Sequence, residues 1–346
     1  MHCLMEGCYM LKRSICLLAV FVLVLSGCAN VRLTTGLTSK QFARIDGYEV
    51  DMSVANLLLS EYKSSYESMF NKDVWNKDVN GITMEKYVKN TVKDALESII
   101  YTRNMAKELK IDITEDEKQR VKDAAKEYME SLETEATSYD IQAVENFYTD
   151  LLLAEKAFYA VTDSVDTVVS TDEARMIQVQ YIYLSTVTYD ENNELITLTD
   201  GEKTLKKEQG LMILEELEGG AEFGALAVAY SDDPDYSMEL TRGEHCEEFC
   251  DAAFALEMGK TSKLVESPYG YYIIKCINYN MDCDYNEQCE KIILSRRKTV
   301  FTEIYLEYAK NRVTEYNDNF WDKNPMSDLQ SGSGKLFDIY KKEVQN

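Results

Sequence analysis

The first half of the chain places apolar residues at intervals of three and four, which is the spacing of amphipathic helices. Thr114 and Glu117 form a capping-box pattern that predicts the start of one helix. Core packing explains the aromatic residues among these apolar positions, so we expect no cofactor. We predict an all-helical bundle for this region. The stripes are Val54, Leu57, Leu58 and Tyr62; Tyr87, Val92, Leu96, Ile99, Ile100 and Met105; Val121, Ala125, Tyr128 and Leu132; and Val144, Phe147, Leu151, Leu152 and Ala154.

Near residues 163–170 the pattern changes from helical spacing to strand-like runs. Apolar and polar residues alternate over 177–184, which is typical of a half-buried strand. A polar stretch over 188–200 follows, and Gly219 and Gly220 end the next helical pattern. These elements form an α/β unit of roughly 105 residues, which is well within the usual size of a domain. Strands are predicted over 177–184 and 271–277, and helices over 201–217, 223–229 and 249–256.

A long helix is predicted over 286–311. Its apolar stripe is larger than a small α/β unit needs to close its core, so we expect it to pack on the N-terminal bundle. The predicted fold class is therefore α+β, with a helical domain built from both ends of the chain and an inserted α/β domain. The stripe consists of Ile292, Ile293, Val300, Ile304, Tyr305 and Tyr308.

The charge balance excludes one class of partner. The chain has 37 basic and 61 acidic residues, a net charge of −24. Nucleic acids are bound mainly through basic groups that face phosphates, so we expect no nucleic-acid partner. The same charge repels anionic lipid headgroups, so the body of the protein is expected to stand off a membrane surface.

The N-terminal segment has the layout of a secretory signal. Lys12 and Arg13 precede an apolar run over 15–25, and small residues follow it before Cys28. The run is too short to span a bilayer, which takes about 20 apolar residues. The ending Leu-Ser-Gly-Cys resembles the bacterial lipobox, which implies that Cys28 carries a diacylglyceryl anchor. We expect an extracytoplasmic protein that is lipid-anchored to a bacterial membrane; the alternative is an ordinary secretory signal that contains a cysteine.

The cysteines that follow Cys28 all lie in the last third of the chain. An extracytoplasmic location permits disulfides, for which the pairs Cys246/Cys250 and Cys283/Cys289 are close enough in sequence. Cys276 lies within a predicted buried strand and is expected to be a free thiol. The Cys-x-x-x-Cys spacing is not that of a familiar zinc knuckle, so we expect no metal.

Three ordered motifs give the α/β unit a family resemblance. They lie over 215–233 (helix, double glycine, then Ser-Asp-Asp), over 249–262 and over 265–275. Together they resemble the parvulin-type peptidyl-prolyl isomerases, and the resemblance covers 172–277. Flanking helices on a lipoprotein are similar in arrangement to the PrsA/SurA-type extracytoplasmic foldases. This resemblance implies peptidyl-prolyl cis/trans isomerisation and chaperone binding.

The resemblance also implies a site, with departures from the family pattern. Tyrosines occupy the two positions where parvulins carry histidines, and the glycine-rich segment is shortened to 235–241. Such substitutions predict a degenerate active site. The implied catalytic residues are Asp233, Tyr181 and Tyr272, and the implied substrate-binding residues are Phe249, His245 and Phe254.

Each implied site residue also has a plain structural interpretation. Tyr181 and Tyr272 could fill the sheet face, as aromatic residues commonly do in strands. Asp233 precedes a proline and could be a turn residue. His245 lies in a polar loop and could be a surface residue, and Phe249 could simply belong to the core.

Two functions stay open at this point. Rotation of an X–Pro bond crosses a barrier of about 18–20 kcal/mol, which an isomerase lowers by favouring the twisted amide. The alternative is a catalytically weak or inactive holdase that only binds unfolded chains. Both have unfolded or newly exported polypeptides as partners, and homodimerisation stays open. The predicted segments are a signal peptide (1–27), a tether (28–45), a helical chaperone domain (46–168), a parvulin-like domain (169–280), a C-terminal helix on the helical domain (281–322) and a polar tail (323–346).

Overall fold

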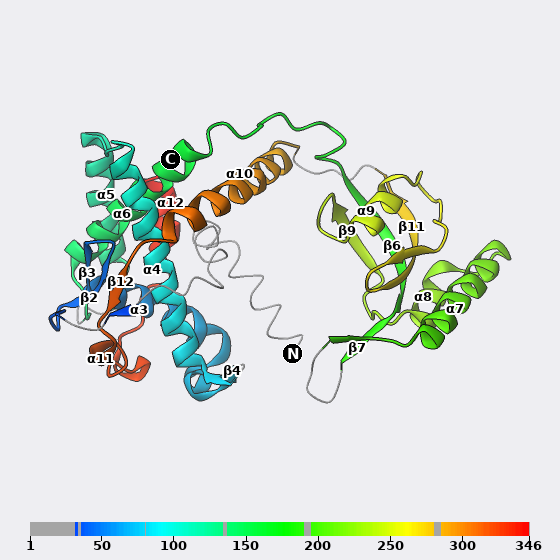
Figure 1. Ribbon diagram of the computed structural model, residues 1–346, viewed down its shortest axis with the longest axis horizontal. Helices are drawn as coiled ribbons and strands as arrows, with labels where there is room; N and C mark the ends of the chain where they lie inside the picture. Colours follow the sequence, from blue (N-terminus) through cyan, green and yellow to red (C-terminus); the bar gives the residue numbers. More distant parts are fainter. Residues whose placement is uncertain are drawn as a thin grey trace. The chain divides into compact units, whose positions relative to one another are not determined.

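The computed structural model consists of two compact units (Figure 1). One, the helical unit, comprises residues up to 165 and 297–346, and the other, the inserted unit, comprises 166–296. The predicted α+β fold class is confirmed. The predicted signal peptide and Cys28 lie outside the described residues. The structure describes residues 32–33, 36–79, 81–133, 137–189, 195–279 and 285–345.

Four helices form most of the helical unit. Their apolar stripes are buried as the spacing predicts, with Leu57, Ile99 and Leu151 all fully buried. The predicted capping box is present: the Thr114 backbone N–H donates to Glu117 Oε2 at 2.6 Å, and the Glu117 N–H donates to Thr114 Oγ1 at 3.2 Å. No helix in the described part of the chain is both long and apolar enough to cross a membrane. The helices are α3 (Met52–Phe70), α4 (Met84–Glu108), α5 (Glu115–Glu130) and α6 (Ile141–Val161).

The helical unit also contains a sheet, so the predictions of an all-helical bundle and of a tether reaching residue 45 were wrong. Strand β2 (Gln41–Ile45) turns through Asp46 and Gly47 into β3 (Tyr48–Asp51). Both turn residues have positive φ, 46° and 78°, as a two-residue hairpin with an Asp-Gly turn requires. The other side of β2 pairs with β12 (Thr314–Tyr316), which in turn pairs with β1 (Arg32–Leu33).

The C-terminal segment is a structural part of the helical unit, so the prediction of a polar tail over 323–346 was wrong. Helix α12 (Leu336–Glu343) packs on α5 and buries Leu336, Ile339 and Tyr340. Their spacing of three and four places them on one helix face, but the stripe is too short to stand out in the sequence. Smaller elements of this unit are η1 (Lys72–Asn76), β4 (Asp78–Val79), β5 (Ile82–Thr83), α11 (Asp318–Trp321) and η2 (Met326–Asp328).

The predicted long C-terminal helix is present as α10 (Tyr285–Ala309). Its second half packs on the N-terminal helices: the Phe301 ring lies 5.1 Å from that of Phe158, and Tyr305 lies 6.2 Å from Tyr101. Ile292 and Ile293, which we placed in the same stripe, are only half-buried.

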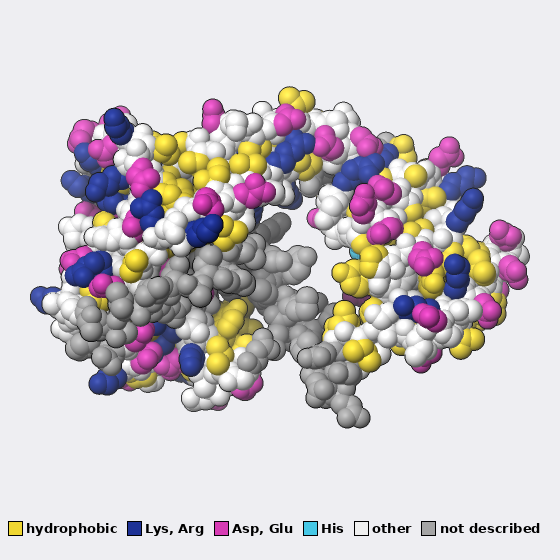
Figure 2. Space-filling model, in the orientation of Figure 1, with side chains coloured by type: hydrophobic (Ala, Val, Ile, Leu, Met, Phe, Trp, Pro, Cys, Tyr) yellow, Lys and Arg dark blue, Asp and Glu magenta, His cyan; other side chains and the backbone are white. Residues whose placement is uncertain are grey.

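The inserted unit is a four-stranded antiparallel sheet with helices on both faces. The strand order is β10-β11-β6-β9. Ile182 and Leu184 of β6 pack with α7 and α8 on one face, and α9 covers the other. Basic and acidic side chains intermix over the face shown in Figure 2. The elements are β6 (Met176–Ser185), α7 (Asp200–Glu218), α8 (Phe223–Tyr230), β9 (Ser237–Thr241), α9 (Glu247–Phe254), β10 (Val265–Ser267) and β11 (Gly270–Asn278).

The stretch that we predicted as merely polar, 188–200, contains a hairpin. Strand β7 (Val187–Tyr189) pairs antiparallel with β8 (Leu195–Thr197). Each strand has only three residues, too few for an alternation to be recognised in the sequence.

Candidate functional site

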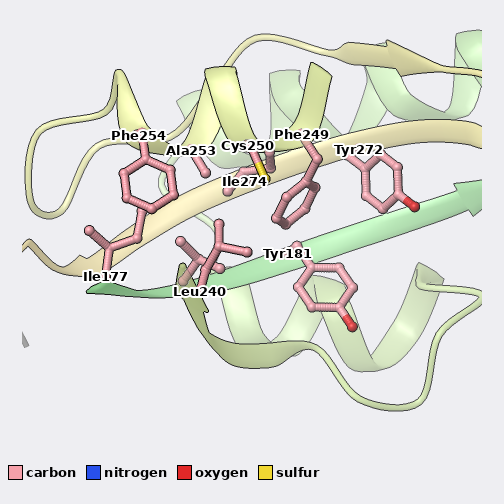
Figure 3. Close-up of a cluster of buried hydrophobic side chains, with 10 residues drawn as sticks. Ile177, Tyr181, Leu240, Phe249, Cys250, Ala253, Phe254, Tyr272 and Ile274 are labelled. Atoms are coloured by element: carbon pink, nitrogen blue, oxygen red, sulfur yellow. The ribbon is translucent and has the colours of Figure 1, made fainter. Parts of the chain in front are cut away.

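The two central strands place the tyrosines of the candidate site on one sheet face. Strands β6 and β11 pair antiparallel, with Tyr183 opposite Tyr272 and Tyr181 opposite Ile274. Alternate residues of a strand point to the same face, so Tyr181 and Tyr183 both lie on the side of α9. Figure 3 shows Tyr181, Tyr272 and Phe249 together at one end of the buried cluster.

These aromatic rings pack closely around Phe249. Phe249 is fully buried, and its ring centroid lies 5.7 Å from Tyr181 and 5.0 Å from Tyr272, both in edge-to-face geometry. Tyr183 stacks on Tyr272 at 4.7 Å, and the His245 ring lies 4.1 Å from Phe249. Edge-to-face and offset-stacked pairs are the favoured aromatic geometries, so this packing is stable by itself. The ring that matches the proline pocket is therefore largely enclosed by its neighbours.

One hydrogen bond ties a tyrosine of the site to the acidic loop. The Tyr181 hydroxyl donates to Asp233 Oδ2 at 2.7 Å, while Asp233 Oδ1 accepts the backbone N–H of Asp235 at 3.0 Å. Asp233 is therefore a turn residue and a site residue at the same time. Burial raises the pKa of Tyr181, and the bond to Asp233 raises it further. The hydroxyl thus stays protonated and acts as a hydrogen-bond donor.

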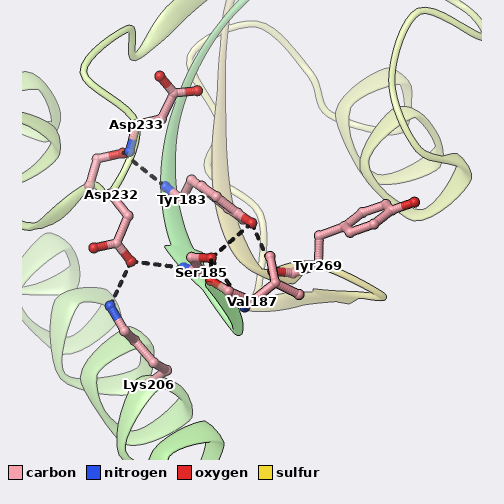
Figure 4. Close-up of polar contacts among 8 residues, drawn as sticks. Tyr183, Ser185, Val187, Lys206, Asp232, Asp233 and Tyr269 are labelled. Atoms are coloured by element: carbon pink, nitrogen blue, oxygen red, sulfur yellow. Dashed lines mark hydrogen bonds and ion pairs between the residues drawn. The ribbon is translucent and has the colours of Figure 1, made fainter. Parts of the chain in front are cut away.

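The residues around this pair were not identified from the sequence. Ser231 Oγ accepts the backbone N–H of Tyr183 at 3.1 Å, and Asp232 Oδ2 accepts Lys206 Nζ at 2.6 Å and the Ser185 N–H at 2.8 Å (Figure 4). These bonds attach the acidic loop to the edge of β6. The Ser-Asp-Asp motif was visible in the sequence, but its partners come from β6 and α7 and depend on the tertiary fold.

Glycine at position 270 permits the close approach of β11 to this part of β6. An added Cβ there would clash with the Leu184 carbonyl oxygen and would lie 2.7 Å from Tyr183 Cε2. The Tyr183 ring could not then keep its place against Tyr272. Gly270 therefore belongs to the framework of the site.

His245 lies in the loop before α9 and is half-buried against Phe249. Its Nδ1 accepts the backbone N–H of Cys246 at 2.9 Å, which leaves Nε2 to carry the proton of the neutral ring. Burial lowers the pKa of His245, partly offset by the charge of Asp233. The ring is therefore neutral near pH 7 and contributes mainly apolar surface.

Phe254 lies apart from the other candidate residues. Figure 3 shows it beside Ile177 at the opposite end of the cluster. The guanidinium groups of Arg175 and Arg242 lie 5.1 Å and 4.5 Å from its ring, which is otherwise buried in the core. The structure thus brings together five of the six candidate residues and gives Phe254 a place in the core.

The cysteines near the site are free thiols. Cys246 is half-buried and Cys250 is buried, and the structure forms no disulfide between them, contrary to one expectation. Cys276 is buried and free, as predicted, while Cys283 lies outside the described residues. Within the described ranges, no group of three or more His, Cys, Asp or Glu side chains has the geometry of a metal site.

Comparisons with known proteins agree with this geometry. Residues 164–280 match the family model of the PPIC-type PPIase domain. The chain is 26% identical over 291 residues to the foldase protein PrsA of Caldanaerobacter subterraneus subsp. tengcongensis, which covers 80% of this chain and 87% of that protein. It is 39% identical over 101 residues to the foldase protein PrsA 4 of Bacillus cereus, covering 28% of this chain and 34% of the relative.

A crystal structure of the peptidylprolyl isomerase PrsA from Bacillus cereus is also similar. It aligns with a TM-score of 0.37 and 21% identity, over 93% of this chain and all of that one. The resemblance of the inserted unit to the parvulin-type isomerases is confirmed by the family match.

Proposed function

We propose that this chain, whose residues 164–280 form a PPIC-type PPIase domain, is an extracytoplasmic foldase that binds unfolded exported polypeptides and isomerises their X–Pro bonds slowly. The hydrogen bond of Tyr181 to Asp233, set in a closely packed aromatic cluster, is the observation that carries this proposal. It retains one polar pair of the site without the two histidines, and the half-buried rings of Tyr183 and His245 provide the apolar surface for proline.

The slow rate follows from what catalysis of this rotation requires. Only interactions that are stronger with the twisted amide than with the planar one lower the barrier. Tyr181 already donates its hydroxyl to Asp233, so it is not free to donate to a client amide without breaking that bond. Loss of one positioned hydrogen bond of this kind costs about 10²-fold in rate.

Binding of unfolded chains does not require stabilisation of a twisted amide, because exposed apolar surface is sufficient for it. The helical unit offers such surface along α3, where the rings of Tyr62, Tyr66 and Phe70 follow one another at 6.4 Å and 6.1 Å. Trp75 is buried behind this row, and its ring packs 6.0 Å from that of Tyr66. This row supports the second candidate function, a holdase that binds clients without isomerising them.

We expect the unmodified protein to isomerise an Ala-Pro test peptide about 10²-fold more slowly than a histidine-bearing parvulin domain, yet to suppress aggregation of an unfolded client. Tyr181→Phe removes the donor of this hydrogen bond and Asp233→Ala removes its acceptor, so each should lower the residual rate and the double variant should lower it no further. Exchange measurements on the peptide and light scattering of the client check these two activities.

Asp235→Asn is the matched control, because the hydrogen bond of Asp235 to the site comes from its backbone N–H and is kept in the variant. It should leave the rate unchanged. A wild-type rate equal to that of typical parvulins, lost on Asp233→Ala, would show that the site is fully catalytic. Absence of any effect on client aggregation would refute the foldase assignment.

The proposal also includes anchoring of the protein to a membrane through Cys28. The Leu-Ser-Gly-Cys ending of the signal supports it, since two acyl chains hold a protein stably on a membrane. Cys28→Ser should shift the protein from the membrane fraction to the soluble fraction or leave it unprocessed. Cys16→Ser, within the apolar run, serves as the control and should fractionate as wild type. Membrane-bound, normally processed Cys28→Ser protein would contradict a lipid anchor.

A further inference from the structure

We propose that the β7–β8 hairpin and Tyr269 extend the client-binding site along one apolar face, the hairpin face, which takes the extended, apolar segment next to the X–Pro bond. The hairpin face consists of Val187, Tyr189, Leu195 and Tyr269. This inference rests on the proposed function and names the kind of client segment that the site prefers.

Large apolar side chains are exposed on this face. Tyr189 is 64% exposed, Leu195 51% and Tyr269 50%. Tyr189 pairs directly with Leu195, so both lie on one side of the hairpin, which Val187 shares because it is two residues from Tyr189. Ile196 pairs with Thr188 and lies on the opposite side.

Hydrogen bonds attach the start of the hairpin and Tyr269 to the tyrosines of the site. Tyr183, whose ring stacks on Tyr272 at 4.7 Å, donates its hydroxyl to the Tyr269 carbonyl oxygen at 2.7 Å. The same carbonyl accepts the Thr186 N–H at 2.9 Å, which holds the start of the hairpin against the β10–β11 turn. Figure 4 shows Val187 beside Tyr269, next to the Tyr183 hydroxyl.

The composition of the hairpin favours a neutral, apolar occupant. Its two strands read Val-Thr-Tyr and Leu-Ile-Thr and carry no charged side chain. At the neighbouring edge of the site, Lys206 neutralises Asp232 at 2.6 Å. Figure 2 shows hydrophobic atoms gathered around β7. Contiguous exposed apolar surface of this kind usually marks an interaction site.

The geometry sets the length and conformation of the occupant. A residue before proline is restricted to extended backbone, so a client presents an extended segment next to the bond. Tyr189 lies six positions after Tyr183, and the chain bends at Thr186 between β6 and β7, so the two residues are at most about 20 Å apart. A client therefore needs at most about six residues beyond its proline to reach the end of the hairpin face. Over the described residues, β7 and β8 pair only with each other. Ser185 Oγ bonds both backbone groups of Val187 in β7, so we expect such a segment to add along the outer edge of β8.

Two peptides test the inference on the full chain. One has four residues around Ala-Pro and spans only the tyrosine site, while the other extends it by six residues on each side with leucine at alternate positions. We expect the long peptide to bind the wild type at least about 10-fold more tightly, since it buries several more apolar side chains. Dissociation constants from fluorescence anisotropy provide the measurement.

Neighbouring residues on opposite sides of the hairpin supply the variants. Leu195→Ser and Tyr189→Ser should each weaken binding of the long peptide about 5-fold, and leave the short peptide unaffected. Ile196→Ser removes a similar apolar side chain, 45% exposed, from the other side and should change neither affinity.

Equal affinities of the two peptides for the wild type would overturn the inference, as would an equal loss in Ile196→Ser and Leu195→Ser. Unchanged binding of the short peptide shows that the variants remain folded. If the wild type binds neither peptide, the proposed client-binding function is refuted. The hairpin inference rests on that function and is then refuted as well.

Discussion

Deletion of residues 323–346 should unfold the helical unit. The segment lost contributes Leu336, Ile339 and Tyr340 to the core, and burial of side chains of this size stabilises a fold by about 1.5–3 kcal/mol each. The truncation would thus remove a large part of the free energy of unfolding, which totals about 5–15 kcal/mol for a typical domain.

Buried charged groups increase the cost of this deletion. Glu61 accepts the Leu336 backbone N–H at 3.2 Å, and Lys63 Nζ donates to the Met326 and Leu329 carbonyl oxygens at 2.7 Å and 2.8 Å. Both residues are buried, with 5% of Glu61 and 8% of Lys63 exposed. Each buried polar group that loses its partner costs about 1–3 kcal/mol, and more if it is charged.

Urea denaturation followed by tryptophan fluorescence measures the effect directly. Both tryptophans, Trp75 and Trp321, are buried in the helical unit, so the signal reports on that unit alone. Tyr340→Phe removes only the hydroxyl that donates to Glu155 at 2.9 Å and should cost about 1–3 kcal/mol. Lys341→Ala, at an exposed position of the same helix, should leave the midpoint unchanged. A truncated protein with the wild-type midpoint would show that the segment is dispensable.

The second large effect is a gain of activity. Tyr181→His combined with Tyr272→His should raise the isomerisation rate by about 10²-fold, the usual value of a positioned polar group in a transition state. Imidazole is smaller than phenol, so the exchange opens space beside Phe249, whose ring now lies 5.0 Å from Tyr272 and 5.7 Å from Tyr181. Exchange of the Ala-Pro peptide measures the rate.

The paired control is Tyr181→Phe with Tyr272→Phe, which keeps the rings and removes the hydroxyls. It should lower the rate, whereas suppression of client aggregation should change in neither double variant. A rate that stays at the wild-type value in the histidine variant would mean that enclosure of the pocket by aromatic rings, not the loss of histidine, limits catalysis.

Elements with a long local pattern were predictable from the sequence. Strands β6 and β11 and helices α7 and α8 were expected near their observed positions because each carries a sustained period of 2 or 3.6 residues. The short strands β2 and β12 were not, because their stability comes from pairing between segments about 270 residues apart. Local sequence carries no signal for such a pairing.

The candidate site, like the fold, was predictable from the sequence only in part. Motif spacing identified Tyr181, Asp233 and Tyr272, but the stacking of Tyr183 on Tyr272 depends on the register of β6 and β11, which motif spacing does not define. The enclosure of His245 against Phe249 likewise depends on how α9 lies on the sheet. Tertiary packing therefore decided which residues join the site.

Strand β12 and helix α12 complete the helical unit from late in the chain, and this has a consequence for folding after export. The N-terminal helices of an exported chain emerge first, yet their sheet and their buried charges find partners only when residues 314–346 emerge. The inserted unit is contiguous in sequence and can reach its native contacts earlier. A protein proposed to bind unfolded chains is thus itself partly folded for a time. Apolar faces of its helices stay exposed until residues 323–346 emerge.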